Sequence, residues 1–197
     1  MKTLKRILAG LLIVIVLLVI AGFFILNYIK KAAIPDYSKD IKLNELSGEV
    51  NVLRDSLGIP HIYANNESDL YKAVGFAMAQ DRLWQMDLLR RVTQGRLSEI
   101  LGAKMAETDL LMRSLRIQEK SEKIIAGASP EIINALEAFS DGVNQYITRY
   151  PLPPEFKVLG YHPELWQAVH SINLIGYMSW DLTSGWGTEF FLNQLKG

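Results

Sequence analysis

Residues 54–102 read RDSLGIPHIYANNESDLYKAVGFAMAQDRLWQMDLLRRVTQGRLSEILG and decide how the chain folds. Around its start, the segments EVNVLRD and IPHIYA alternate apolar and polar residues, and Gly58 lies between them. This pattern predicts a β-hairpin with Gly58 in the turn. Asn66 and the acidic residues after it are typical of the start of a helix. Apolar side chains then recur every three or four residues, which predicts a long helix.

The predicted apolar face of this helix includes a carboxylate. The face consists of Leu70, Val74, Ala77, Asp81, Trp84, Leu88 and Val92. An unpaired buried carboxylate is costly, so Asp81 needs a cationic partner. We expect a structural ion network made of Arg54, Asp81, Arg82, Arg90 and Arg91, with Arg96 as a further candidate. The alternative is a functional cluster in which Asp81 transfers protons or an arginine binds substrate.

The second half of the chain also reads as helical. Ser129 and Pro130 are typical of a helix cap and a first helical residue. An apolar stripe follows at Ile132, Leu136, Phe139, Val143 and Ile147. Residues 155–166 read as an irregular connector, and a last helical stretch starts near residue 171, breaks at TSGWG and resumes at TEFFLNQL. The sequence therefore predicts a mostly α fold with a small β-hairpin.

The N-terminus carries an uncharged apolar segment, Ile7–Leu26. As a helix, its 20 residues would span about 30 Å, enough to cross a bilayer. A cleaved signal peptide is the alternative, but its apolar region is shorter and ends at a small-residue cleavage site. We expect residues 1–29 to be a transmembrane signal anchor and residues 30–47 a polar stalk. The chain would then be a single-pass cell-membrane protein with an extracytoplasmic body.

The charge composition of the chain bears on whether it binds nucleic acid. The chain has 21 basic and 21 acidic residues, and five of the basic ones lie at or before Lys31. The body beyond Lys31 therefore carries 16 basic and 21 acidic residues, a net charge of −5, which argues against a nucleic-acid partner. The chain has no cysteine, which suits an extracytoplasmic location.

No catalytic motif is visible in the residues themselves. His61, His162 and His170 are scattered without the spacing of metal ligands, so each is expected to be a packing or loop residue. A cluster of aromatic and apolar residues near the C-terminus is either ordinary core or the wall of an apolar acyl pocket. Its members are Tyr177, Met178, Trp180, Leu182 and Trp186.

Three stretches resemble the penicillin acylase (penicillin amidase) family. The first is RDSLGIPHIYA at 54–64, continued by GFAMAQDRLWQMDLLRRVTQGRLSEILG at 75–102. The second is LPPEFKVLGYHPELW at 152–166, and the third is GYMSWDLTSGWGTEFFLNQL at 176–195. Together they cover about residues 48–197. His170 departs from the family pattern, which usually has Asp there, and this puts a helix-capping interaction in doubt.

The resemblance implies a fold and a reaction. Members of the family are N-terminal-nucleophile hydrolases with an αββα fold, cut from one precursor into an α chain, a spacer and a β chain. The nucleophile is the first residue of the β chain, and its own α-amine, with a pKa of about 7.7–8.0, acts as the base. Residues 48–197 would be an α-chain-like domain with no catalytic residue, inactive without its β-chain partner.

The substrates implied are small N-acylated compounds, and the reaction is hydrolysis of their linear amide bonds. β-Lactams with acyl side chains and N-acyl homoserine lactones are both candidates. No organic cofactor is implied. The alternative from another class of protein is a non-catalytic α fragment that acts as a binding or remnant protein.

The resemblance also implies binding residues. Met178 matches the methionine of the family's acyl pocket. Asp181 and Leu182 fall where penicillin G acylases carry Arg and Phe, and Trp180 and Trp186 are alternative pocket walls. Glu189 matches a ligand of a structural Ca²⁺, although an exposed glutamate at a helix start is the alternative, since Ca²⁺ takes six to eight oxygen ligands.

Overall fold

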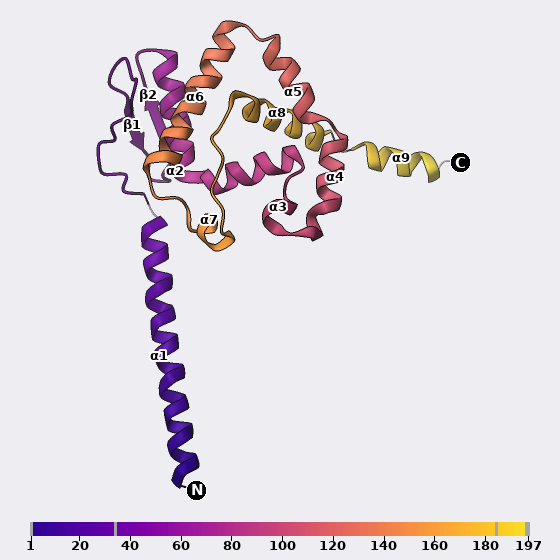
Figure 1. Cartoon of the computed structure of the whole chain (residues 1–197). Helices are drawn as coiled ribbons and strands as arrows, with labels where there is room; N and C mark the ends of the chain where they lie inside the picture. The colour runs from indigo at the N-terminus through magenta and orange to yellow at the C-terminus, as the bar shows by residue number, and fades with distance from the viewer. Residues whose placement is uncertain (1, 34, 184, 196–197) are drawn as a thin grey trace.

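The computed structural model describes residues 2–33, 35–183 and 185–195 (Figure 1). One long helix projects from a helical body that holds a single hairpin. In chain order the elements are α1 (Lys2–Ala33), β1 (Asn51–Arg54), β2 (Pro60–Tyr63), α2 (Glu67–Gln94), α3 (Ser98–Leu101), a 3-10 turn (Ala103–Met105), α4 (Ala106–Ser114), α5 (Ile117–Ala126), α6 (Pro130–Arg149), α7 (Pro154–Leu159), α8 (Ala168–Leu182) and α9 (Trp186–Leu195). The predicted mostly helical fold with one small hairpin is confirmed.

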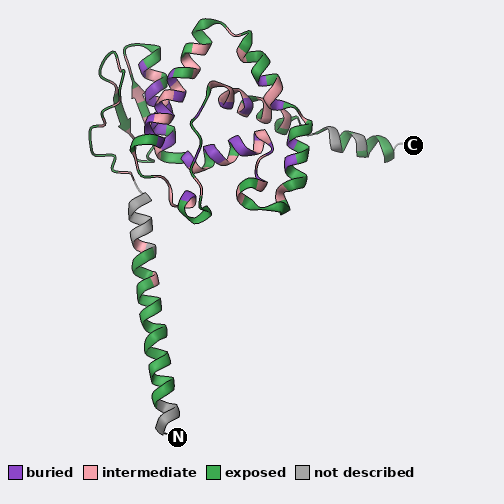
Figure 2. Cartoon of the chain, viewed as in Figure 1, coloured by how far each residue is buried: buried purple, intermediate pink, exposed green. Residues whose placement is uncertain are grey.

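The helix α1 stands apart from the body. Its apolar segment, Arg6–Ile25, is long and apolar enough to cross a membrane and is not buried against the rest of the chain. Figure 2 shows this segment exposed along its length. The helix runs on to Ala33, so the expected boundary between helix and stalk at residue 29 lies inside it.

Residues 35–50, which we name the strap, are bound to the body and do not form a free stalk. Ser47 and Gly48 donate their backbone N–H groups to the buried Asp69 carboxylate at 3.0 and 3.1 Å. Asn44 donates its N–H to Gln145 Oε1 at 2.8 Å. The Asp69 pKa lies below its usual range, first because of the Ser47 hydrogen bond. The strap therefore holds the base of α1 close to the body.

The hairpin forms where the sequence predicts it. β1 and β2 are antiparallel, with Asn51 opposite Tyr63 and Arg54 opposite Pro60. Gly58 adopts a φ of 78° in the connecting loop, a conformation that glycine takes without strain. The hairpin could be predicted from the alternation of apolar and polar residues in the two strands and from Gly58 between them.

Helix α2 begins as predicted but buries a different face. Asn66 Oδ1 accepts the Asp69 N–H at 2.8 Å and caps the helix. A kink with φ −144° and ψ 24° occurs at Arg82. Asp81, expected on the buried face, is exposed. The core side of the helix is made instead by Phe76, Ala79, Leu83 and Met86. Of the predicted face, Ala77 is buried and Trp84 packs half-buried against the core. Asp81 does not, because several elements pack around α2 and its large apolar residues do not mark one buried side.

Helices α2 and α6 cross at very short distance, and glycines make this possible. A Cβ on Gly142 would lie 1.9 Å from the Lys72 carbonyl oxygen, and one on Gly75 would lie 2.1 Å from the Phe139 carbonyl oxygen. Both distances are far below van der Waals contact, so only glycine fits at either position.

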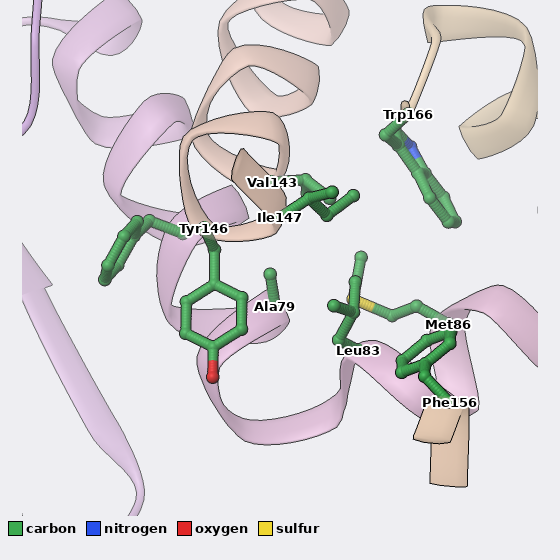
Figure 3. Packing of buried hydrophobic residues seen from close by; sticks show 9 residues of the cluster. Ala79, Leu83, Met86, Val143, Tyr146, Ile147, Phe156 and Trp166 are labelled. Carbon is green, nitrogen blue, oxygen red and sulfur yellow. The ribbon is translucent and has the colours of Figure 1, made fainter. Parts of the chain in front are cut away.

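The core lies around this crossing (Figure 3). Leu83 of α2, Val143 of α6, Phe156 of α7 and Trp166 before α8 meet there, each almost fully buried. Helix α6 starts at Pro130 as predicted, although the first residue of its stripe, Ile132, is exposed. The expected irregular connector contains the short helix α7. Helix α8 lies within the arch formed by α2, α6 and α5 (Figure 1).

Candidate functional site

Helix α8 carries four of the five residues expected to line an acyl pocket. The Gln167 N–H donates to Nδ1 of His170 at 3.0 Å, and the His170 N–H donates to the Gln167 carbonyl at 2.9 Å. The doubt about this cap is therefore resolved, because the histidine ring accepts the hydrogen bond that an Asp would accept. Burial, and then the nearby Arg90 cation, lowers the pKa of His170 to about 4. Its ring is therefore neutral at pH 7, as this cap requires.

Three of the five predicted pocket residues lie together on one side of α8. Met178, Asp181 and Leu182 share a face by helical spacing, and Ile175 extends it. We name these four residues the α8 face. Met178 is 56% exposed and Leu182 is 79% exposed. The α8 face is therefore an open apolar surface with one carboxylate and not a closed pocket.

The two tryptophans do not belong to this face. Trp180 lies on the opposite side of α8, half-buried, with its ring 6.2 Å from that of Tyr177. The Trp186 side chain lies outside the described residues.

Glu189 is exposed in the first turn of α9. Across residues 2–33, 35–183 and 185–195, no three His, Cys, Asp or Glu side chains come together as metal ligands. The described residues alone do not fit a calcium ion, because Glu189 offers at most two of the oxygen ligands such a site needs.

The expected ion network exists as two separate clusters. The inner cluster surrounds Asp87, which is 1% exposed. Asp87 Oδ1 pairs with the Arg90 guanidinium, and Oδ2 accepts from Arg91 Nε at 3.1 Å and from the Tyr161 hydroxyl at 2.7 Å. Burial, and then the hydrogen bond to Asp87, raises the pKa of Tyr161. Sequence reasoning included both arginines but missed Asp87, the carboxylate at their centre.

This cluster continues toward the surface through alternating charges. Arg91 Nη1 pairs with Glu99 at 2.8 Å, and Arg96 pairs with Glu99 at 2.8 Å and with Glu164 at 2.7 Å. The Arg96 hydrogen bond is the main reason that the pKa of Glu164 is lowered to about 2. The chain of charges ties α2 and α3 to the segment before α8.

The second cluster joins the strap, the hairpin and α2. Arg54 makes a bidentate pair with Asp81, with Nη1–Oδ2 and Nη2–Oδ1 distances of 2.9 and 3.0 Å. The Tyr37 hydroxyl donates to Asp81 Oδ1 at 2.9 Å. Arg82, also expected in the network, is exposed and takes part in no ion pair among the described residues.

The two clusters hold their central carboxylates in the same way. Asp81 and Asp87 each accept hydrogen bonds on both oxygens from arginine and tyrosine. Loss of either carboxylate would leave arginine cations without their partner.

An apolar groove that sequence reasoning did not identify lies beside α8. Its volume is about 420 Å³. Met78 and Met86 of α2, Phe139 of α6 and Leu174 of α8 are among its lining residues. Trp166 also lines it, and its Nε1–H is already bound by Ser171 Oγ at 3.0 Å. Leu174 is one helical turn before Met178, so the wall of the groove continues toward the α8 face.

Comparison with known proteins places this body in a family. The family model described as penicillin amidase matches residues 49–196. The chain belongs to the penicillin amidase family. The match spans the hairpin, the inner cluster, the Arg54–Asp81 pair and the α8 face, and it confirms the resemblance seen in the sequence.

Similar proteins include both penicillin acylases and acyl-homoserine lactone acylases. Over 157 residues the chain is 41% identical to a penicillin acylase 2 proenzyme from Pseudomonas sp. strain SE83, covering 79% of this chain and 20% of the relative. Over 131 residues it is 37% identical to the acyl-homoserine lactone acylase QuiP of Pseudomonas fluorescens strain Pf-5, covering 66% and 16%. The chain thus spans about a fifth or less of the length of these curated relatives.

A solved structure of the family agrees with the fold. A thermostable penicillin G acylase from Alcaligenes faecalis superposes with a TM-score of 0.62 at 31% identity, covering 68% of this chain and 73% of that chain. The match covers similar fractions of the two chains, so the matched chain of that acylase is close in length to this one.

Proposed function

We propose that residues 48–197 are the α-chain part of a membrane-anchored amidase of the penicillin amidase family. The whole protein would hydrolyse the linear amide bond of an N-acyl compound to a carboxylate and an amine. The family match over residues 49–196 carries this proposal. Relatives named as penicillin acylase and as acyl-homoserine lactone acylase support the substrate class.

The α8 face would form one wall of the acyl pocket. Met178 and Leu182 offer flexible apolar surface, which suits an aliphatic acyl group. Asp181 adds a negative charge that would disfavour substrates with a carboxylate near the entrance. The flexible aliphatic surface of Met178 and Leu182 would therefore favour fatty acyl groups over phenylacetyl.

A β chain would complete the site. Asp81 and Asp87 are both held by arginine and tyrosine, and the proenzyme relative is about five times as long as the matched region. The β chain would supply the nucleophile, cover the α8 face and fill the apolar groove. An exposed apolar surface such as the α8 face together with this groove is typical of a protein interaction site. Glu189 would give one ligand to a calcium site that β-chain oxygens complete.

Helix α1 would anchor this assembly in the cell membrane with the body outside the cytoplasm. Three basic residues precede its apolar segment and would stay on the cytoplasmic side.

The test is to purify the protein from its own membranes with an antibody against the body. N-terminal sequencing of each co-purified chain would identify the partner, and hydrolysis of phenylacetyl and fatty acyl amides would be followed by release of the amine. We expect a second chain that begins with a nucleophilic residue, usually Ser, together with amidase activity.

A matched preparation with that first residue changed from Ser to Ala should lose the activity and keep the fold. A protein that purifies as this chain alone, without hydrolysis of either substrate, would support the non-catalytic binding or remnant alternative.

A further inference from the structure

We propose that helix α7 lies on the surface of the bilayer beside α1 and holds the body in a fixed orientation to the membrane. This inference rests on the anchor in the proposed function. It names a second membrane contact, made by Lys157, Val158 and Leu159, which we call the α7 tip.

The α7 tip lies at the base of the body. Helices α1 and α7 are in contact, and Figure 1 shows α7 beside the C-terminal end of α1, on the side of the body that faces the long helix. The apolar segment of α1 ends at Ile25 and the helix at Ala33. The outer eight residues are about 12 Å long. The headgroup layer is about 5–8 Å thick on each side of a bilayer, so α7 lies at or just above the level of the headgroups.

The side chains of α7 are divided between the core and the outside. Phe156 is almost fully buried and packs edge-on against the Trp84 ring at 5.6 Å. Val158 is 78% exposed, Leu159 is 36% exposed and Lys157 is also exposed. Phe156 thus fixes the short helix, while two apolar side chains and one cation point away from the body.

This combination fits the interface of a bilayer. Val158 and Leu159 can enter the headgroup layer, and the Lys157 ammonium can pair with lipid phosphate while its stem lies on apolar surface. The contact is small, and a free protein would not bind a membrane through it. Here α1 already holds the protein at the membrane, so the second contact forms at high effective concentration.

The strap keeps the body near the membrane. Tyr37 is fixed to Asp81 by a hydrogen bond of 2.9 Å and lies under the Arg54 guanidinium at 4.0 Å. It is four residues beyond Ala33, and four extended residues span at most about 14 Å. The body therefore cannot move far from the end of α1, and the contact between α1 and α7 places α7 near that end.

The chain contains no cysteine, so single labels can be placed without side reactions. Three variants of the full chain, Leu17→Cys, Val158→Cys and Ile124→Cys, are labelled with one environment-sensitive fluorophore and reconstituted in phosphatidylcholine vesicles. Leu17 reports on the anchor. Ile124, an exposed residue near the end of α5 that lies far from α1, is the matched control.

Lipids with a quencher in the headgroup or deep in the acyl chain measure the position of each label. We expect the deep quencher to act on the Leu17 label and the headgroup quencher to act at least about threefold more on the Val158 label than on the Ile124 label. Equal quenching at Val158 and Ile124, with Leu17 quenched, overturns the α7 contact and leaves the anchor intact.

Two other outcomes also contradict the inference. A Leu17 label that no lipid quencher reaches shows that the anchor itself is wrong. A Val158 label with blue-shifted emission but no lipid quenching shows that protein, either a partner chain or a second copy, covers the α7 tip.

Discussion

Replacement of Gly142 by alanine should force the two main helices of the body apart. The new methyl group would lie 1.9 Å from the Lys72 carbonyl oxygen and 2.8 Å from the Phe76 nitrogen. Both are backbone atoms of α2, so no side-chain rotation can make room. Ordinary contact begins near 3.4 Å. The helices must therefore separate by about 1.5 Å, whereas a gap of 0.5–1 Å already forfeits a quarter to a half of a dispersion contact.

We expect Gly142→Ala to lower the free energy of unfolding by about 3 kcal/mol, the upper end of the usual range for overpacking. For a chain of this size, each kcal/mol shifts Tm by about 2–4 °C, so Tm should fall by roughly 6–12 °C. The measurement is thermal unfolding of the full chain in detergent, followed by circular dichroism.

The matched control is Gly127→Ala. Its new methyl group would be 3.7 Å from the nearest heavy atom, and the backbone φ of −104° is open to alanine. Tm of this variant should stay within about 2 °C of the parent, as expected for a substitution without a clash. The reasoning is refuted if Gly142→Ala also stays within that range, or if both variants fall equally.

Four further outcomes are expected. Asp87→Asn leaves the buried Arg90 and Arg91 without their carboxylate, and it should lower the free energy of unfolding by about 3–5 kcal/mol in urea titration. Asp81→Asn, at the more exposed cluster, should lower the free energy of unfolding clearly less. The pKa of His170 is about 4 in the folded protein against 6.5 in the unfolded chain. The free energy of unfolding should therefore be at its full value above pH 6.5 and fall by up to about 3 kcal/mol between pH 6.5 and 4. His170→Asn should flatten this pH profile of Tm, and an unchanged profile would contradict the role given to the neutral His170 ring. In the assembled enzyme, Leu182→Phe should shift the ratio of phenylacetyl to fatty acyl turnover by about ten- to a hundredfold toward phenylacetyl, and an unaltered ratio would remove Leu182 from the acyl site. If Glu189 holds calcium in that assembly, a chelator should lower Tm of the parent and leave Tm of Glu189→Ala unaffected.

Local signals in the sequence were sufficient to predict where several helices begin and where the hairpin turns. Gly58 marks the hairpin loop, Asn66 caps α2 and Pro130 opens α6, because each of these depends on the backbone preferences of one or two residues. The uncharged run at residues 7–26 predicts α1 equally directly. Such features require no knowledge of what packs against them.

Burial on α2 could not be predicted in the same way. The spacing of large apolar residues placed Asp81 on the core side, but the structure buries Asp87 and exposes Asp81. Small residues such as Ala79 make close contacts that hydrophobicity alone does not reveal, and the kink at Arg82 changes the register of the helix faces. Some charges also pair with residues far along the chain, such as Arg96 with Glu164 at a separation of 68 residues, which is beyond the reach of a local pattern.

The strap sets an order of events during biogenesis. Asn44 is bound by Gln145, which follows it by 101 residues. At about 5–20 residues per second, the ribosome needs roughly 5–20 s to make the chain between them. If α1 is the membrane anchor that we propose, it would enter the membrane during that time, while the strap beside it still lacks part of α6 as its partner. The nascent protein would then be held at the membrane first, and the strap would be bound to the body only after most of the body has been synthesised.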